Sequence, residues 1–571
     1  MKGKIFIALM FFLPLMIGLF CFFHSQTILG DLGDARFNMY ILEHGYRWLS
    51  GLAPSYWSAS FFFPAKNVVA FSDNLLGSMP IYALSRWLGN NRESSYQQWL
   101  ILCFILNYAS SYWVLRQWAI SLIGALAGAY LFTFGLPVMA QIGHPQLIPR
   151  FMVPIGFYFW IRFFITRRPL YFSISLGALL WQIYIGIYTG FFLGLSFLFC
   201  LFALLPSPKN FFLLRSHFSF RKKTAQDLYL FLKITALRFA GRDFRYYWVA
   251  IALFLLGLLP LAIPYSEAAR TVGTHSWNDI SLQLPRIASY FRGPESILYG
   301  KEMNFGNTLP LPGEQQLFLG WIPIASLISF ALIGRYRIEK QNPFPSRILI
   351  GSVFISIIMT LDIHGLSLYW FISRLPGAGA IRGVSRIILV MLFPISAILG
   401  YCITRFEEID RFLSEDKRNP YSKWRLIGVV AVVPLLIIDQ MSIVPSFGKD
   451  SSRGRIESLK NELQNTIKND HFQKNYNNNV FWINQGSGNF VETQIDAMLA
   501  GQDLGWKTIN GYSGNLPLDY GVQMFFLKSG KCREFARWIH SHKNAFNGKN
   551  VVIVGKPCKG WKESSITSEE K

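Results

Sequence analysis

Long apolar runs separated by short polar loops dominate the first three quarters of the chain. A helix of roughly 20 apolar residues crosses the hydrocarbon core of a bilayer, and about eleven runs approach this length. They cover residues 5–23, 97–116, 119–137, 148–166, 170–188, 190–206, 246–264, 317–334, 348–362, 386–404 and 426–444. The pattern predicts a polytopic α-helical membrane protein with about eleven transmembrane helices in residues 1–445.

The fifth and sixth runs share the segment "IGIYTGFFLG" with almost no polar residue between them. This segment fits a tight hairpin between two spans, and it fits a re-entrant bend equally well. The first run ends in "LFCFFHSQ" without a small-residue cleavage site, so we interpret it as an uncleaved membrane anchor and not as a signal peptide.

A long aromatic loop, residues 24–96, follows the first run. Near its end, Ile81, Leu84, Trp87 and Leu88 share one helical face. This spacing favours either a short helix lying in the membrane interface or a helix packed on neighbouring spans.

The chain changes character after residue 445. "RIESLKNELQNTIKND" and "VETQIDAMLAGQDLGW" have the spacing of surface helices, whereas "NNVFWIN" and "KNVVIVG" are typical of short strands. This alternation predicts a small α/β domain over residues 446–571.

The distribution of basic residues predicts the orientation of the spans. The net charge is +23, but the basic residues do not form one face, which argues against nucleic acid as a partner. They fall in alternate loops, which by the positive-inside rule lie in the cytoplasm. These loops contain Lys2 and Lys4, Arg116, Arg167 and Arg168, and the segments 209–245, 335–347 and 405–425. We therefore expect a multi-pass protein of the bacterial inner membrane with a cytoplasmic N-terminus and a periplasmic or external C-terminal domain.

Two of the six cysteines, Cys532 and Cys558, are the pair in the predicted outer tail. An oxidising compartment permits a disulfide between them. Closing a loop of this size contributes on the order of 3 kcal/mol in the chain-entropy model.

Ionisable residues gather at the predicted outer ends of the spans. Taken singly, each is explained as a helix cap, a solvated loop residue or a headgroup anchor. Taken together they indicate a water-filled cavity, because charges near hydrocarbon are costly. The set contains Asp31, Asp34, Arg36, Asp73, His144, Arg150, Glu267, His275, Asp362, His364, Arg382 and Arg386.

The motifs that are missing restrict the chemistry of this cavity. The sequence has no Walker A loop, no Rossmann glycine fingerprint and no CxxC or HExxH spacing. A lipid carrier with a phosphate-linked head group is the substrate that an outer leaflet offers. Transfer from such a carrier needs a carboxylate base, for which Asp34 and Asp31 are suited, and cations that stabilise the leaving phosphate. The candidate cations are Arg382, Arg386, Arg150 and His144.

Several segments resemble the GT-C superfamily of polyprenol-phosphate-sugar glycosyltransferases, including uncharacterised bacterial members. "GDLGDARFNMYILEHGYRWLSG" and "FFFPAKNVVAFSDN" resemble the first outer loop of the oligosaccharyltransferase and mannosyltransferase branches. The resemblance implies that Asp34 is the catalytic aspartate, with Asp31 second and Asp73 a later acidic residue of the loop. "QIGHPQLIPR", "GAIRGVSR" and "TINGYSGNLP" are similar to segments of the bacterial proteins. The WWD-type motif of oligosaccharyltransferases is absent from the tail, so transfer to asparagine is not implied.

The resemblance also implies candidate ligands for a divalent cation. Some members of the superfamily use a divalent cation, and Mg or Mn would need Asp34, Asp73 and His144 to meet in the fold. In the tail, "NGYSG" presents Tyr512 either to a saccharide or to the membrane domain, or it is only a glycine-rich turn. The predicted substrate-binding residues are Arg36, Asp73, His144, Arg150, Glu267, His364, Arg382, Arg386 and Tyr512.

These observations lead to one expected function and two alternatives. We expect an inverting hexosyl- or pentosyltransferase that moves a sugar from a polyprenyl-phosphate donor to a glycan, lipid or protein acceptor of the cell envelope. The alternatives are a transporter or flippase of lipid-linked glycans, and a non-catalytic envelope scaffold whose tail binds a partner.

Overall fold

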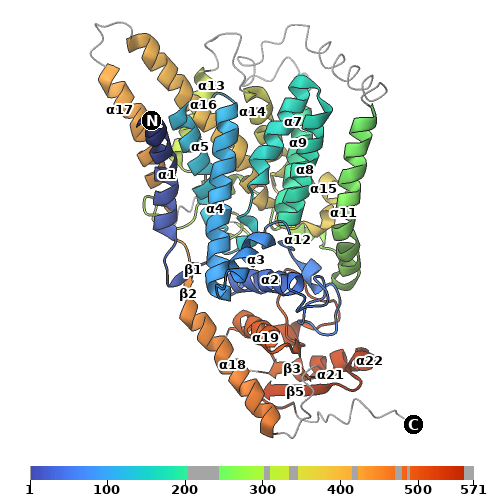
Figure 1. Ribbon diagram of the computed structural model, residues 1–571. Coiled ribbons are helices and arrows are strands. Elements are labelled where there is room, and N and C mark those ends of the chain that lie inside the picture. The colour runs from blue at the N-terminus through green and yellow to red at the C-terminus, as the bar shows by residue number, and fades with distance from the viewer. Residues whose placement is uncertain are drawn as a thin grey trace.

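Helices make up most of the computed structural model, which describes residues 2–203, 244–300, 309–333, 345–414, 422–469, 479–484 and 489–558. A bundle of apolar helices forms one end of the molecule, and a small domain that contains the C-terminal sheet forms the other (Figure 1). The basic segments 209–243, 335–344 and 415–421, the end of the sixth run and residues 559–571 lie outside the described residues.

Apolar helices occupy each of the runs that the hydrophobic pattern predicted. Within the described residues, five helical segments are long and apolar enough to cross a membrane, as expected of a multi-pass membrane protein. The count of eleven spans stays a prediction. The bundle contains α1 (Lys2–Phe22), α4 (Arg92–Gln117), α5 (Leu122–Phe134), α6 (Leu136–Ala140), α7 (Met152–Thr166), α8 (Pro169–Ile185), α9 (Ile187–Ala203), α11 (Phe244–Val272), α13 (Trp321–Ile333), α14 (Ser346–Thr360), α16 (Ile388–Ser414) and α17 (Ser422–Asp439).

The fifth and sixth runs form a tight helical hairpin. Only Gly186 separates α8 from α9, and the two helices pack against each other. At Gly190 a Cβ atom would lie 2.6 Å from the Cα atom of Ile183, so a glycine is required where the helices approach. The segment is therefore a tight turn between two packed helices, and the choice between two full spans and a re-entrant bend stays a prediction.

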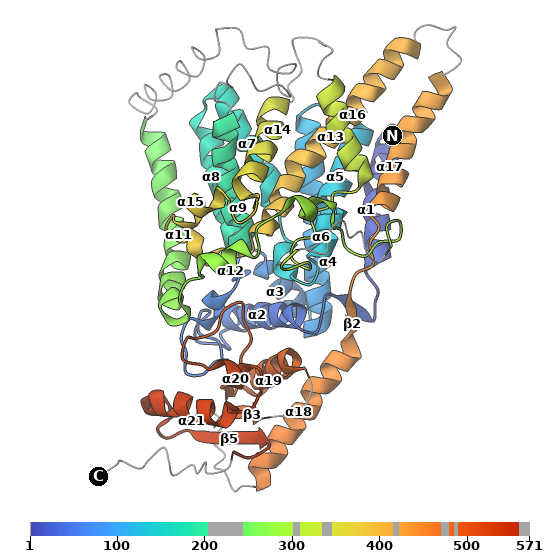
Figure 2. The same ribbon diagram turned by 180° about the vertical axis from the view of Figure 1, so that it is seen from behind.

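The first outer loop folds across the end of the bundle that faces the small domain (Figure 2). It contains α2 (Asp34–Leu49), the 3-10 helix η1 (Val68–Phe71) and α3 (Met79–Trp87). Helix α3 packs on α2 and α4 through one face, while Leu84 and Trp87 on the other face are 55% and 57% exposed. This combination of a packed face and an exposed apolar face suits a helix at the membrane interface.

The C-terminal region contains a small parallel sheet in the order β4-β3-β5. Its strands are β3 (Asn479–Asn484), β4 (Lys507–Thr508) and β5 (Asn550–Gly555), and β3 is buried along its whole length because it is the central strand. The helices around the sheet are α18 (Lys449–Asn469), α19 (Phe490–Leu504), α20 (Val522–Phe525), α21 (Lys531–Ser541) and α22 (Lys543–Phe546). A disulfide joins Cys532 in α21 to Cys558 after β5.

Three connections are among the many contacts that hold this domain against the membrane bundle. Strand β2 (Ser446–Gly448) pairs with β1 (Thr27–Leu29), directly after α1. The backbone of residues 60–63 in the first outer loop bonds to that of residues 508–510, next to β4. The third connection is an ion pair in which Arg36 Nη2 of α2 lies 2.6 Å from Asp496 Oδ1 of α19. The helical bundle and the C-terminal domain are therefore joined by strand pairing, backbone hydrogen bonds and an ion pair.

The remaining short helices lie in the predicted outer loops of the bundle. They are η2 (Pro145–Leu147), α12 (Trp277–Ser281), η3 (Ile287–Phe291), α15 (Tyr369–Ser373), η4 (Ala378–Ala380) and η5 (Val384–Ile387).

Candidate active site

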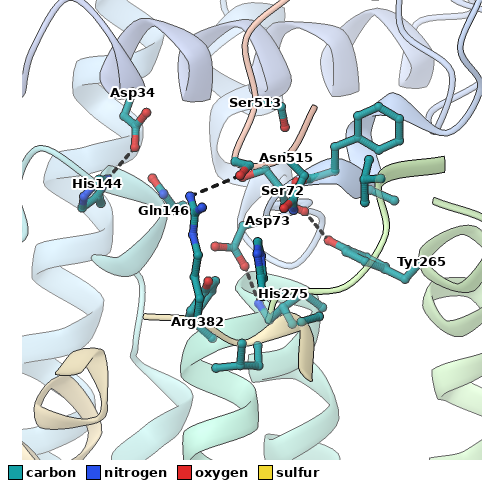
Figure 3. A pocket seen from close by; sticks show the side chains of 18 of the residues that line it. Asp34, Ser72, Asp73, His144, Gln146, Tyr265, His275, Arg382, Ser513 and Asn515 are labelled. Atoms are coloured by element: carbon teal, nitrogen blue, oxygen red, sulfur yellow. Dashed lines mark hydrogen bonds and ion pairs between the residues drawn. The ribbon is translucent and has the colours of Figure 1, made fainter. Parts of the chain in front are cut away.

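A cavity of about 240 Å³ lies where the first outer loop, the ends of α9 and α11, and the C-terminal domain meet (Figure 3). Its lining is mixed, with charged, aromatic and backbone groups. The predicted site residues that line it are Asp34, Asp73, His144, Arg382, Arg386 and Tyr512, and His275 of the wider polar set lines it as well. The structure therefore brings Asp34 and Arg382 to the same cavity.

Asp34 is the first residue of α2, where the helix dipole favours a negative charge. Its Oδ2 atom lies 2.5 Å from His144 Nδ1, and its Oδ1 atom accepts a hydrogen bond of 2.5 Å from the Tyr512 hydroxyl. Asp31 differs, since its Oδ1 accepts from the backbone N–H groups of Gly33 and Ala35 and it does not line the cavity. Asp31 thus accepts hydrogen bonds from backbone N–H groups at the start of α2, whereas Asp34 faces the cavity.

A chain of charged groups continues from Asp34 across the cavity wall. His144 Nε2 lies 2.8 Å from Glu314 Oε1. Glu314 in turn accepts two hydrogen bonds from Arg386, from Nη2 at 3.0 Å and from Nε at 3.2 Å. We call Asp34, His144, Glu314, Arg386 and Tyr512 the Asp34 cluster. Its charges alternate in sign, so each ionised group supports the next.

Glu314 is the member of the cluster that the sequence did not indicate. It lies in "LPGEQQ", a Gly- and Pro-rich part of the outer loop 265–316. A single acidic residue in such a loop has no spacing that sets it apart from a solvated charge. Its place in the last part of that loop, before an apolar run, was the only available signal.

The electrostatics of the cluster keep the carboxylates ionised and the imidazole protonated. Burial raises the pKa of Asp34, but the hydrogen bond and charge of His144, with the Tyr512 hydroxyl, bring the pKa below its ordinary value. Burial and the Arg386 charge lower the pKa of His144, yet its hydrogen bonds to Asp34 and Glu314 raise the pKa to about 9. Burial and the adjacent Asp34 raise the pKa of Tyr512 well above its usual range. At neutral pH the cluster therefore holds an imidazolium between two carboxylates, and the phenol keeps its proton.

The raised pKa of His144 predicts a pH-dependent stability. Because the unfolded histidine has a pKa of about 6.5, the stabilisation is fully present below that pH and is lost as the pH rises through about 9. We expect wild type to unfold at a higher temperature than His144→Gln at pH 6, with the difference shrinking as the pH passes 9. A series of thermal unfolding curves for both proteins measures this. A difference that stays constant up to alkaline pH would contradict the assignment.

Asp73 lies in the same cavity but does not join Asp34 in a ligand set. Its Oδ1 atom accepts a hydrogen bond of 2.6 Å from the backbone N–H of Ile187, at the start of α9. Burial raises the pKa of Asp73 to about 6, although the bond to Ile187 acts against it.

The geometry does not fit the cation site that required Asp34, Asp73 and His144. Mg and Mn prefer oxygen ligands that are free to coordinate, whereas both imidazole nitrogens of His144 contact carboxylates. Across the described ranges, no group of three or more His, Cys, Asp or Glu side chains is arranged to hold a metal ion.

Arg382 and Arg386 have different surroundings. The Arg386 guanidinium is held by Glu314 and lies 4.9 Å from the centre of the Tyr188 ring. Arg382 donates from Nη2 to the backbone oxygen of Gly514 at 3.2 Å, and it forms no ion pair within the described part of the chain. Arg382 is therefore the cation that remains available to an anionic ligand in the cavity (Figure 3).

The structure places four of the predicted substrate-binding residues, as well as Asp31, away from this cavity. Arg36 is fully buried between Asp496 and Ser452 on the opposite side of α2. Arg150 is fully buried, and it donates to the backbone oxygen of Phe132. Glu267 is exposed on α11, where it accepts a hydrogen bond from Asn67. His364 lines a separate cavity beside Asp362 and Arg286. These four do not line the cavity, because a predicted place at the end of a span does not determine which way a side chain points.

Comparisons with known proteins give a distant structural match. No protein-family model matches the chain, and no curated protein matches its sequence. The crystal structure of the Archaeoglobus fulgidus oligosaccharyltransferase in complex with Zn and sulfate aligns over 88% of this chain and 62% of that chain. The identity is 12% and the TM-score is 0.45. The chain has distant structural similarity to an archaeal oligosaccharyltransferase. It spans 62% of that protein's length.

Proposed function

We propose that the protein is an integral-membrane glycosyltransferase. In this proposal it transfers a sugar from a polyprenyl-phosphate donor to an envelope acceptor on the outer side of the bacterial inner membrane. The observation that supports it is the cavity in which the Asp34 carboxylate and the Arg382 guanidinium both lie. A base and a cation in one cavity are the two groups that such a transfer needs.

The cavity is lined by the first outer loop and by residues 512–515 of the C-terminal domain, and this domain lies at one end of the bundle (Figure 1). The basic loops and the N-terminus belong to the other side of the predicted topology. A lipid-linked donor in the outer leaflet would therefore reach the cavity with its head group at the level of α2 and its chain among the helices.

The proposed reaction is a single inverting displacement. The acceptor hydroxyl gives its proton to Asp34 as its oxygen attacks the anomeric carbon of the sugar. The bond between that carbon and the phosphate oxygen breaks, and the electron pair leaves with the lipid phosphate. Arg382 binds the phosphate as its charge increases. Because Arg386 is already paired with Glu314, we assign it to holding the Asp34 cluster and not to the leaving group.

The experiment that tests this function uses the full-length protein in proteoliposomes with a polyprenyl-phosphate-linked sugar and envelope extracts as acceptors. Transfer is expected to release lipid phosphate in proportion to the sugar that reaches the acceptor. Movement of the intact lipid-linked sugar across the bilayer, without release of lipid phosphate, would indicate a transporter instead. Absence of both activities in a folded protein supplied with acceptor extract would favour a scaffold.

Removing the Arg382 charge is expected to weaken donor binding. A charge-assisted hydrogen bond contributes about 1.5–3 kcal/mol, so Arg382→Ala should raise the KM for the donor roughly 10- to 100-fold. Arg374→Ala is the matched control, since Arg374 is exposed, stacks on Trp370 and does not line the cavity. Initial rates at increasing donor concentration measure the effect. An unchanged KM in Arg382→Ala would remove this residue from the phosphate site.

A further inference from the structure

Both carboxylate oxygens of Asp34 are occupied by groups of the protein itself. His144 contacts Oδ2 and the Tyr512 hydroxyl contacts Oδ1, each at 2.5 Å. The side chain of Asp34 is only 16% exposed. Because little of the side chain is exposed, the most direct way for an acceptor hydroxyl to bond to the proposed base is to replace one of these two contacts.

The two contacts are not equally easy to break. His144 is held from its other side by Glu314, which in turn accepts from Arg386. The hydroxyl of Tyr512 has one partner, Asp34, among the contacts that the structure describes. Tyr512 and the acceptor have the same functional group, a hydroxyl that can donate a hydrogen bond to Oδ1 of Asp34. Tyr512 is thus the group that an acceptor hydroxyl can replace without changing the bonding of Asp34.

The loop that carries Tyr512 is fixed at its base. Asn510 accepts a hydrogen bond from the backbone of Ile483 at 2.7 Å and donates to Gln494 at 2.8 Å. At Gly511 the place of a Cβ atom is taken by the Phe62 ring of the first outer loop, so the loop lies directly on the membrane domain. These contacts direct the side chain of Tyr512 into the cavity.

The rim of the same loop is held by two single hydrogen bonds. Asn515 donates to the backbone oxygen of Phe71 at 2.8 Å, and Gly514 accepts from Arg382 at 3.2 Å. Arg382 is the residue assigned above to the donor phosphate. A phosphate that takes the Arg382 guanidinium would remove one of the two bonds at the rim, and the bond of Asn515 to Phe71 would still hold Tyr512 on Asp34 until an acceptor hydroxyl replaces it.

We infer that the Tyr512 hydroxyl occupies the place on Asp34 that the acceptor hydroxyl later takes. In this place it prevents the base from activating water until a donor and an acceptor are bound. This inference rests on the proposed function and goes beyond it, because it gives the C-terminal domain a role in the reaction. Tyr512 acts as a positioning residue through Asp34.

The side reaction that Tyr512 suppresses is hydrolysis of the donor. Water would give one proton to Asp34 while its oxygen forms a bond to the anomeric carbon. The bond from that carbon to the phosphate oxygen would break, and the products would be free sugar and lipid phosphate. Keeping water away from a reactive centre is a common role of groups that close an active site.

The test is Tyr512→Phe in the full-length protein, assayed with a polyprenyl-phosphate sugar in the absence of acceptor. Donor hydrolysis is expected to rise about tenfold, the factor to which a hydrogen bond of ordinary net strength corresponds. Asn515→Ala, which frees the rim of the loop, is expected to raise hydrolysis in the same direction. Tyr520→Phe is the matched control, because Tyr520 is also buried in this domain and its hydroxyl has no hydrogen-bond partner among the described residues.

The outcomes separate this inference from the proposed function. Increased hydrolysis in Tyr512→Phe and Asn515→Ala, but not in Tyr520→Phe, supports it. Unchanged or lower hydrolysis in folded Tyr512→Phe, or an equal rise in Tyr520→Phe, overturns it while transfer by wild type still stands. If Asp34→Asn retains full transfer, the assignment of the base fails, and the inference fails with it.

Discussion

Asp34→Asn is expected to lower the rate of sugar transfer by about 10²- to 10⁴-fold, the usual contribution of a positioned general base. The asparagine side chain has the same shape and can still contact His144 and Tyr512. It cannot accept a proton from the acceptor hydroxyl, so the chemical step slows while donor binding is preserved. Single-turnover transfer from a pre-bound donor measures that step directly.

Asp31→Asn is the informative comparison for this variant. Asp31 is three residues before Asp34, but its carboxylate bonds to the backbone at the start of α2 and not to the cavity. We expect Asp31→Asn to change the free energy of unfolding and the transfer rate little, because the asparagine Oδ1 can still accept from the N–H groups of Gly33 and Ala35. A large loss of transfer in Asp31→Asn with full activity in Asp34→Asn would reverse the two roles.

Asp496→Ala is expected to weaken the attachment of the C-terminal domain to the bundle. It leaves the fully buried guanidinium of Arg36 without its carboxylate partner. Breaking one side of a buried ion pair costs about 3–5 kcal/mol, because the remaining charge stays buried and uncompensated. Thermal unfolding, followed together with protease cleavage after α17, reports both the loss of stability and the release of the domain.

The control for this second variant is Asp450→Ala on α18. Asp450 also pairs with an arginine, Arg453, but its side chain is 85% exposed. Exposed ion pairs contribute about 0–1 kcal/mol, so this substitution should leave the unfolding temperature nearly unchanged. Similar losses in both variants would show that burial of the Arg36 ion pair is not what holds the domain.

The helices of the bundle were predictable because the requirement for an apolar span is local. A run such as 190–206 indicates a helix without knowledge of its neighbours. The hairpin between α8 and α9 was not decided by the same signal, since its key contact is between Gly190 and Ile183 on facing helices. Contacts between helices depend on which faces meet, and a hydrophobic pattern with few polar residues does not specify a face.

The candidate site shows the same limit at the level of single residues. Asp34 was indicated by a local resemblance, and the structure places His144 and Arg386, from two distant segments, in the same cluster. Arg36 was grouped with them from its place in the chain, yet two residues of helix turn the side chain by about 200° and direct it to Asp496. Glu314 was missed, because its function depends on two partners that only the fold brings near it.

Residues 60–63 pair with the backbone beside β4, and an isolated C-terminal domain would lose this pairing. Thr508 both donates to Ser60 and accepts from Phe63. A soluble fragment that starts at residue 446 would lack this partner and would present an open sheet edge to solvent. Open edges recruit further strands, so we expect such a fragment to self-associate unless a peptide carrying Ser60–Phe63 is supplied in trans.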